Sequence, residues 1–181
     1  MESLGSEAVY SGAWLSVRND MVRRPDGSTG VYSVVDTADC ALVTPVDGDR
    51  FHLVEQYRHL VGDRRWEFPS GSVDAHDDDS AAAAARELRE ETGLVASELT
   101  RLGTLDTMPS TLNQRCTVFV ARGLTQHTAQ REPEEQDMKS AWFERSEVER
   151  LIREGVFCDA RSVAAYALFL LTAMPQHPTH H

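Results

Sequence analysis

The sequence predicts an α+β or α/β sandwich, with a mixed sheet and helices on its faces, preceded by a β-rich N-terminal segment. Strand-like stretches fill the first third of the chain, and helices and further strands follow one another in the remainder. This order of elements is typical of a sheet that is covered by helices. The chain has 181 residues, of which 41% are hydrophobic and 26% charged. That size and composition are ordinary for about one globular domain.

Four strands are expected in the first third, at residues 14–22, 31–35, 40–46 and 51–57. The first two flank residues 24–27, where Pro, Asp and Gly form a typical turn sequence. The last two flank the Asp-Gly-Asp turn at residues 47–49, which predicts a hairpin.

A helix is expected after this strand-rich part, because five alanines occupy residues 81–85 and alanine is the best helix former. Asp79 or Ser80 can cap its start, and Gly93 stands where a left-handed C-terminal cap belongs. One face of this helix presents apolar side chains for packing on a sheet, namely Ala81, Ala84, Ala85 and Leu88.

The same helix carries three carboxylates on another face, because Glu87, Glu90 and Glu91 stand at i, i+3 and i+4. Such crowded like charges favour a divalent cation between them, and oxygen ligands suit a hard ion such as Mg²⁺. Arg86 lies four residues before Glu90 and can orient that carboxylate. The alternative is a solvated charged helix without a ligand.

Two strands and two helices are expected in the last third. The strands are expected at residues 114–121 and 138–143. Ser146 can cap a helix over residues 147–153 that stops at Gly155. Asp159 can cap a last helix that runs through residue 173 and ends at Pro175.

Charge and cysteine content exclude some classes of protein. A net charge of −11 argues against nucleic acid as a partner. The three cysteines are odd in number and lack metal-ligand spacing, which indicates reduced packing residues of a cytoplasmic protein. No signal-peptide pattern begins the chain, and the most apolar run, residues 163–173, is shorter than a membrane span requires. A cytoplasmic protein without a membrane partner is therefore expected.

Residues 71–94 resemble the Nudix box, whose pattern is Gly, five residues, Glu, seven residues, then Arg-Glu-aliphatic-x-Glu-Glu-x-Gly-aliphatic. The second half of the pattern matches at every fixed position: Arg86, Glu87, Leu88, Glu90, Glu91, Gly93 and Leu94. The resemblance implies a Nudix-type α/β/α sandwich with a mixed sheet, and a metal-dependent hydrolase.

The first half of the box departs from the pattern. Counting back from Arg86 places the box Gly at Ser72 and the box Glu at Asp78. The natural glycine is Gly71, from which the five-residue spacing leads to Asp77. The loop is thus one residue longer than usual and carries Asp in place of Glu, so the role of the first box carboxylate is open.

Further motifs resemble those of ADP-ribose and nucleoside-diphosphate-sugar pyrophosphatases. They are the Gln-Tyr-Arg at residues 56–58, the Glu-Phe-Pro-Ser-Gly at residues 67–71, and Pro109. The resemblance implies hydrolysis of the diphosphate of ADP-ribose or a related nucleotide sugar, with Mg²⁺ or possible Mn²⁺ as cofactor. Residues 110–114 lack the subfamily's Gly-rich loop, so GDP-mannose or a dinucleotide polyphosphate are alternative substrates. A non-catalytic nucleotide sensor is a further alternative.

The resemblance also implies roles for individual residues. The expected metal ligands are the Ser70 carbonyl, Glu87, Glu90 and Glu91, and the expected substrate-binding residues are Arg58, Glu67 and Pro109. Arg58 would contact a phosphate, although a surface salt bridge is the alternative. Glu67 would lie at the metal or substrate edge, although an outward strand residue is as plausible.

The catalytic residues expected by resemblance are Arg86, Glu90 and a base in the acidic loop at residues 132–137, with Glu134 favoured and Glu135 the alternative. The domain organisation expected is residues 1–35 for dimerisation, residues 36–175 for the Nudix domain, and residues 176–181 as a disordered tail. A homodimer is expected, because an apolar N-terminal hairpin is marginal in water without a covering surface.

Overall fold

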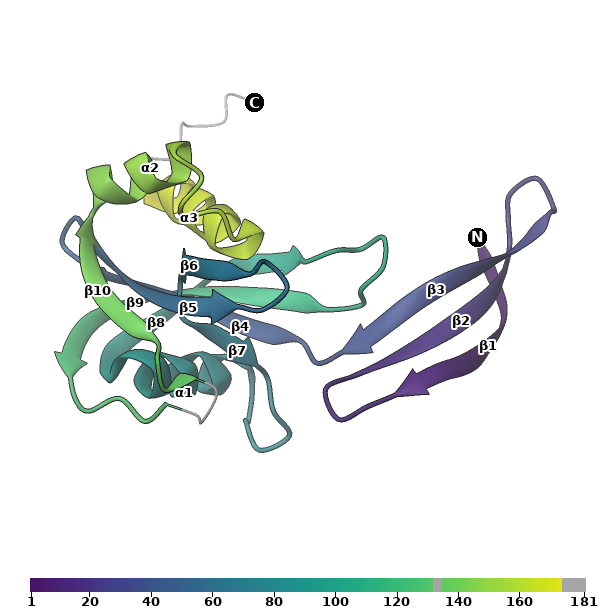
Figure 1. The fold of residues 1–181 in the computed structure, drawn as a ribbon, viewed down its shortest axis with the longest axis horizontal. Helices are drawn as coiled ribbons and strands as arrows, with labels where there is room; N and C mark the ends of the chain where they lie inside the picture. The colour runs from purple at the N-terminus through teal and green to yellow at the C-terminus, as the bar shows by residue number, and fades with distance from the viewer. Residues whose placement is uncertain (132–134, 174–181) are drawn as a thin grey trace, which may run out of the picture.

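The structure, a computed structural model, describes residues 1–131 and 135–173. It contains two sheets, and Figure 1 shows one of them standing apart from the rest of the chain. The separate sheet has the order β1-β2-β3, formed by Glu2–Ser11, Leu15–Arg23 and Thr29–Thr37. The expected hairpin is therefore extended by a third strand, β1, which pairs antiparallel with β2.

The second sheet has seven strands, and its main path runs in the order β10-β5-β4-β9-β8. Its strands are β4 (Cys40–Asp47), β5 (Arg50–Arg58), β6 (Asp63–Glu67), β7 (Ser70–Ser72), β8 (Leu94–Asp106), β9 (Arg115–Gln126) and β10 (Lys139–Glu144). β4 pairs parallel with β9, whereas its pairings with β5 and β7 are antiparallel. The expected mixed sheet is confirmed.

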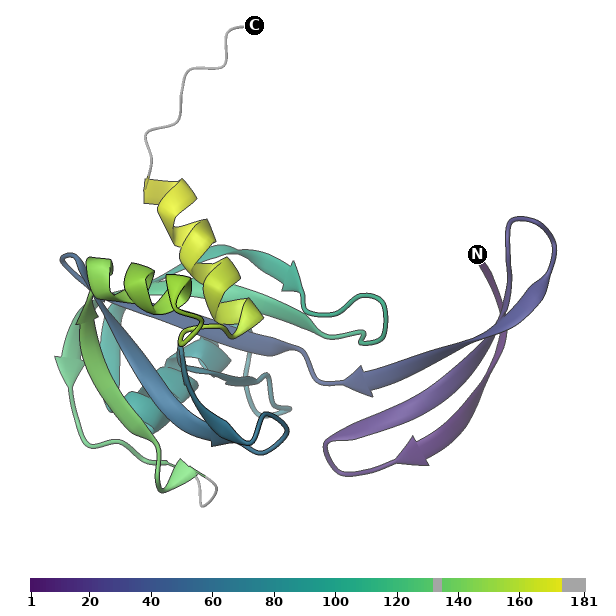
Figure 2. The same ribbon diagram turned by 45° about the horizontal axis from the view of Figure 1, so that its top comes forward.

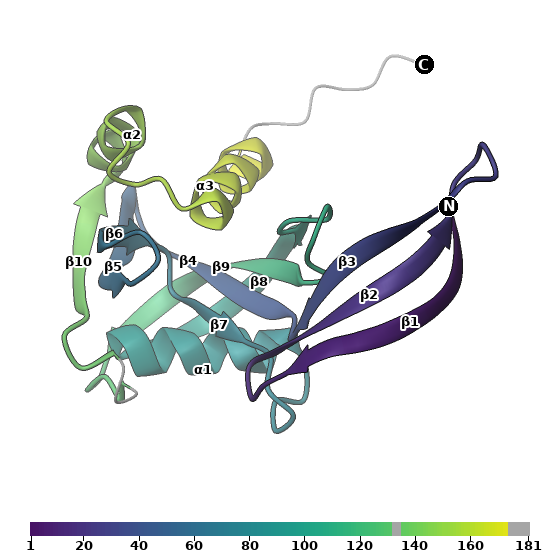
Figure 3. The same ribbon diagram turned by 45° about the vertical axis from the view of Figure 1, so that its right-hand side comes forward.

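Helices cover both faces of this sheet, as Figures 2 and 3 show. α1 (Ser80–Thr92) packs on one face, where Leu88 and two alanines join a buried cluster with Val43 and Phe119. α2 (Arg145–Arg153) and α3 (Ala160–Ala173) lie on the other face, over a core centred on Phe51. The α/β/α layering matches the prediction. Across the described residues, none of the helices is both long and apolar enough for a membrane span.

The caps of α1 and α3 follow the sequence. The Asp79 carboxylate accepts hydrogen bonds from the amides of Ala81 and Ala82, and Gly93 adopts a left-handed φ of 74°. Asp159 accepts a hydrogen bond from the Ser162 amide at the start of α3. These contacts satisfy amides that have no partner within the helix.

Two expectations about local structure were wrong, and three strands were missed. Glu144, not Ser146, caps α2, because it forms a capping box with Glu147. On α1, Ala84 and Leu88 are buried and Ala81 packs beside them as expected, but Ala85 is exposed and Ala83 is buried in its place. Strands β6, β7 and β8 were not expected from the sequence at all.

Candidate active site

Two carboxylates of α1 point inward toward β7. The side chains of Glu87 and Glu91 are buried, with residue exposures of 8% and 1%. Glu90 is more open, with 28% of its side chain exposed. The predicted crowding of carboxylates is therefore real, but Glu87 and Glu91 form its buried part and Glu90 its rim.

Gly71 lets Glu87 approach the backbone of β7. A Cβ atom at Gly71 would lie 2.0 Å from the Glu87 Oε1 atom, so a side chain there would displace the Glu87 carboxylate. The close approach of Glu87 therefore favours glycine at residue 71. The Ser72 carbonyl instead accepts a hydrogen bond of 2.9 Å from Arg86 Nη2.

Asp77 is the loop carboxylate that contacts the box helix. Its two oxygens accept hydrogen bonds from Arg86 Nε and Nη2, at 3.2 and 3.0 Å. Asp78, which the count back from Arg86 favoured, is exposed. The longer loop therefore keeps the carboxylate–arginine contact through Asp77. Asp74, His76 and Asp77 offer ligand atoms within 4.8 Å of one another, yet Asp77 is already engaged by Arg86.

Arg86 forms hydrogen bonds with two of the helix carboxylates. Its Nη1 atom donates to Glu87 Oε1 at 2.7 Å and to Glu90 Oε2 at 3.1 Å, which confirms the predicted pairing with Glu90. The pKa of the guanidinium is raised, first by its hydrogen bond with Asp77. Arg86 thus orients two carboxylates and acts as a positioning residue.

Burial makes the two inward carboxylates hard to ionise. Desolvation raises the pKa of Glu87 from 4.5 to about 7, although Arg86 opposes that rise. Desolvation, followed by the charges of Glu135 and Glu87, raises the pKa of Glu91 well above 4.5. Among the described residues, no group donates a hydrogen bond to the buried Glu91 Oε2 atom. An oxygen held in this way fits a ligand to a hard divalent cation.

Ser70 and Arg58 lie beside this pair. A hydrogen bond from the Ser70 backbone and the charge of Arg58 both lower the pKa of Glu91, against the effect of desolvation. Ser70 is the first residue of β7, next to Gly71. Ser70 therefore lies beside Glu91, and its carbonyl as a metal ligand stays a prediction.

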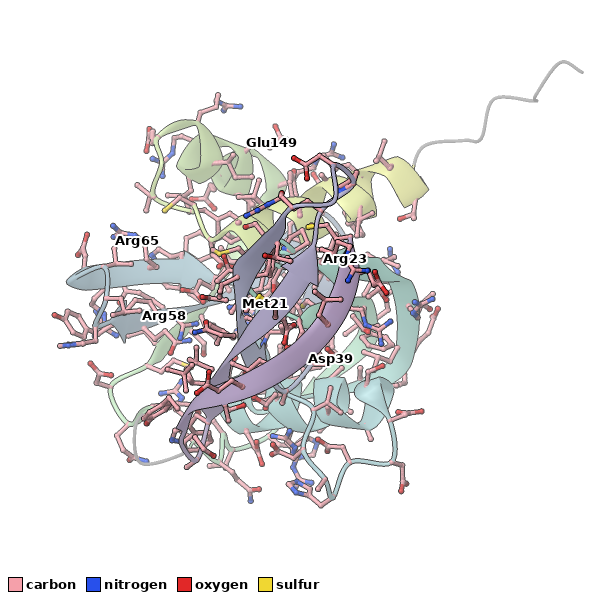
Figure 4. All side chains as sticks on the ribbon, turned by 90° about the vertical axis from the view of Figure 1, so that its right-hand side faces the viewer. Met21, Arg23, Asp39, Arg58, Arg65 and Glu149 are labelled. Atoms are coloured by element: carbon pink, nitrogen blue, oxygen red, sulfur yellow. The ribbon has the colours of Figure 1, made fainter. Side chains whose placement is uncertain are left out.

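Arg58 and Glu67 meet at the wall of a cavity of about 640 Å³. Arg58 Nε donates to Glu67 Oε1 at 2.8 Å, and a second contact makes the pair bidentate. Glu67 is 3% exposed, so the alternative of an outward strand residue was wrong. Arg65 and Asp159 also line the cavity, and Figure 4 shows Arg58 and Arg65 on the same side of the molecule. Arg58 thus makes the salt bridge that was its alternative, and Arg65 pairs with Asp63, so an anionic substrate would bind the remaining N–H groups of these two arginines.

The remaining predicted residues lie in loops. Pro109 is exposed between β8 and β9 and is not among the residues that line this cavity. Glu134 lies outside the described residues. Glu135 is described, and its charge raises the pKa of Glu87 and Glu91, though less than desolvation does. Glu135 is therefore close to the helix carboxylates.

Two arginines that the sequence did not single out hold the ends of the acidic loop. Arg131 Nε donates to the Glu91 carbonyl at 3.1 Å, and its Nη1 atom donates to the Met138 carbonyl. Arg64 donates to Asp137 at 2.6 Å and to Glu55 at 2.7 Å. The Glu91 and Asp137 partners lie 40 and 73 residues away in the sequence, so no local pattern marks these two contacts.

Comparisons with known proteins agree with this geometry. The NUDIX domain model matches residues 36–166, and the model of the nucleoside diphosphate sugar hydrolase N-terminal domain matches residues 1–35. An ADP-ribose pyrophosphatase of Mycobacterium tuberculosis is 35% identical over 165 residues, which cover 90% of this chain and 80% of that protein.

Two further matches are more distant. A methanol dehydrogenase activator of Bacillus methanolicus is 27% identical over 68% of this chain and 67% of its own length. A solved structure described as ADP compounds hydrolase superposes with a TM-score of 0.82 at 25% identity, covering 94% of this chain and 91% of that one. The chain therefore belongs to the Nudix family. It is a Nudix hydrolase, and divalent-metal dependence is general in that family.

Proposed function

We propose that this enzyme hydrolyses the diphosphate linkage of ADP-ribose, or of a closely related nucleoside diphosphate sugar, to a nucleoside monophosphate and a sugar phosphate. The observation that carries the proposal is the buried pair Glu87 and Glu91 beside Gly71, next to the arginine-lined cavity. Similarity to an ADP-ribose pyrophosphatase over 90% of the chain supports the choice of substrate.

Mg²⁺ is the cofactor that this donor set fits, with Mn²⁺ as a substitute, because every donor is oxygen. Glu87, Glu91 and the Ser70 carbonyl would hold it, with Glu90 as a ligand or as a partner of Arg86. The bound ion would supply charge neutralisation at the diphosphate and activation of a water. Arg86 keeps Glu87 and Glu90 turned toward the site.

Arg58 binds a phosphate oxygen in this proposal, and Glu67 fixes its guanidinium. The bidentate contact with the buried Glu67 holds the planar cation in one orientation. Arg65 adds positive charge on the same cavity wall. Pro109 remains a predicted substrate contact from resemblance, and its exposed loop faces the N-terminal sheet.

The base that takes a proton from the attacking water is Glu134 or Glu135 in this proposal. The proximity of Glu135 to Glu87 and Glu91 supports it, whereas Glu134 rests on the sequence alone. Glu134→Gln and Glu135→Gln should be compared singly. Loss of about a hundredfold or more in kcat with KM kept, in one variant only, identifies the base. Near-full turnover in both would place the base on α1.

Substrate preference is tested by incubating the enzyme with Mg²⁺ and ADP-ribose, GDP-mannose, other nucleotide sugars and a dinucleotide polyphosphate. Release of AMP and ribose 5-phosphate should be fastest with ADP-ribose. A higher kcat/KM for GDP-mannose or the dinucleotide would transfer the assignment to that substrate. Tight binding without release of any product would instead identify a sensor.

A homodimer through the N-terminal sheet is part of the proposal, as is a cytoplasmic location. This segment carries large exposed apolar side chains, with Trp14 in the turn between β1 and β2 exposed by 85% and Val9 of β1 by 59%. A three-stranded sheet needs a surface that covers its apolar residues. Light scattering should give twice the 20.2 kDa mass of one chain. A mass near 20.2 kDa at micromolar concentration would rule the dimer out.

A further inference from the structure

The loop between β8 and β9, residues 107–114, is bonded to the N-terminal sheet. The Val35 amide donates to the Thr111 carbonyl at 2.8 Å, and the Asn113 amide donates to the Val35 carbonyl at 3.3 Å. The Tyr32 hydroxyl donates to the Ser110 carbonyl at 2.7 Å. These three contacts join β3 to a loop that lies about 76 residues later in the chain. They were not predictable from local sequence.

Asn113 makes the side-chain contacts at the centre of this junction. Its Oδ1 atom accepts a hydrogen bond of 3.1 Å from the Thr37 amide, and its Nδ2 atom donates to Asp36 Oδ1 at 2.6 Å. Asp36 in turn pairs with Arg18 of β2. One amide group therefore uses a donor and an acceptor to hold the end of β3, and reaches β2 through Asp36.

The segment that follows β3 is bonded to the catalytic domain on two sides. Gln114 Nε2 donates to the Ala38 carbonyl at 2.9 Å, and the Arg115 amide donates to Asp39 Oδ1 at 2.8 Å. The Val73 amide donates to the Asp39 carbonyl at 2.9 Å, directly after β7. Figure 4 shows Asp39 behind the N-terminal sheet, where the sheet meets the domain.

The orientation of the sheet depends on these polar contacts. Among the residues of β1, β2 and β3, all of which the structure describes, Val34 alone is buried. Apolar packing therefore supplies little restraint between the sheet and the domain. A sheet that is held in one orientation loses less freedom when it docks on a second chain.

We infer that Asn113 is a positioning residue, which fixes the N-terminal sheet against the catalytic domain in the orientation that dimerisation uses. The inference rests on the proposed dimeric hydrolase and adds the residue that prepares each chain for assembly. It also gives a function to the polar sequence at residues 110–114, which replaces the Gly-rich loop of relatives.

The first test compares Asn113→Ala with Asn19→Ala. Asn19 accepts a hydrogen bond of 2.7 Å from the Ser33 hydroxyl within the sheet, so the control removes a contact that does not reach the domain. Residue-resolved hydrogen exchange should show the Thr37 amide exchanging about tenfold faster in Asn113→Ala, since its acceptor is lost. Sedimentation should show a dimer dissociation constant about three- to tenfold higher. Asn19→Ala should leave exchange at the Thr37 amide within about twofold.

The second test is a reciprocal exchange. Asn113→Asp places a carboxylate against Asp36 and should raise the dissociation constant more than Asn113→Ala does. The double variant Asp36→Asn with Asn113→Asp restores one donor and one acceptor, with the direction of the bond reversed. Asp36→Asn alone measures the loss of the Arg18 pair. The double variant should lie closer to wild type than Asn113→Asp does, which is coupling between the two positions.

Unchanged exchange at Thr37 in Asn113→Ala, or no coupling in the double variant, would overturn the role of Asn113. A wild-type protein that is monomeric, or that leaves ADP-ribose intact, would contradict the proposed function. In that case the exchange measurement still decides whether Asn113 holds the sheet, because it needs neither substrate nor dimer.

Discussion

The N-terminal sheet and the central sheet of the catalytic domain differ in what surrounds their strands. Every residue of β1 is exposed, whereas β4 buries all its residues except the last. β4 lies between helices on both faces, and β1 lies beneath none (Figure 3). The N-terminal strands therefore gain little from the chain's own core and expose apolar surface such as Trp14.

The catalytic domain has the opposite feature, because its core holds an ionisable carboxyl group. Glu91 is 1% exposed, and burial raises its pKa well above 4.5. One region thus presents apolar side chains to water, and the other presents a carboxylate to the interior. The first favours a second copy of the chain as its partner, and the second favours a divalent cation.

The largest effect is expected for Glu91→Gln, which keeps the shape of the side chain and removes its charge. Turnover of ADP-ribose should fall at least about a hundredfold, or roughly 2.7 kcal/mol of transition-state stabilisation. Glu98→Gln, on the exposed part of β8, is the matched control and should keep full turnover. Unchanged turnover in Glu91→Gln would remove the box helix from the catalytic assignment.

Trp14→Ala tests the other region. Loss of a large aromatic side chain from an interface should weaken the dimer by about thirtyfold, roughly 2 kcal/mol, as measured by sedimentation. Leu171→Ala removes a side chain that is 66% exposed on α3 and should leave the dimer intact. Equal dissociation constants for both variants and wild type would show that the sheet is not the interface.

Asp77→Asn tests the substituted first half of the box. Loss of the carboxylate charge opposite Arg86 should lower turnover by about tenfold and stability by about 1–3 kcal/mol, since this is a hydrogen bond between charged groups. Asp78→Asn, at the exposed neighbouring residue, should change neither quantity. Equal turnover and equal stability in the two variants would show that the contact of Asp77 with Arg86 contributes to neither quantity.

The smallest effect concerns the stability of metal-free protein against pH. Desolvation raises the Glu87 pKa from 4.5 to about 7, so the folded state binds its proton more tightly than the unfolded state does. Glu87 therefore favours folding at low pH, and this contribution is lost as pH rises from about 4.5 to about 7. Denaturant titrations in the presence of a chelator should show that loss in wild type and a smaller one in Glu87→Gln. The same slope in both would contradict the burial of Glu87.

The sequence predicted α1 well, because its residue types act locally. The Asp79 cap, the Gly93 terminator and the pairing of Arg86 with Glu90 depend on residues at most four positions apart. The sequence left Asp77 and Asp78 as alternatives, since spacing alone cannot account for a longer loop. In the structure Asp77 contacts Arg86, whereas Asp78 is exposed.

Strand β8 was not predicted from the sequence, and the reason is physical. It lies at the edge of the sheet, most of its residues are partly or fully exposed, and its register shifts between Arg101 and Gly103. Such a strand lacks the regular apolar alternation that marks half-buried strands. The contacts of Asn113 with Thr37 and of Arg131 with Glu91 could not be predicted from local sequence either, because they join residues 76 and 40 positions apart.

Thermal unfolding of wild type and Glu91→Gln, each with and without Mg²⁺, tests the central claim most directly. Mg²⁺ at about a hundredfold excess over its dissociation constant should stabilise wild type by about 2.7 kcal/mol, or about 5–10 °C in Tm. Metal-free Glu91→Gln should unfold at or above the wild-type temperature, because the amide cannot ionise in the buried site, and Mg²⁺ should raise its Tm by less than half as much. The account would be contradicted if Mg²⁺ left the wild-type Tm unchanged and metal-free Glu91→Gln had a lower Tm than wild type. Glu91 would then not be a buried metal ligand.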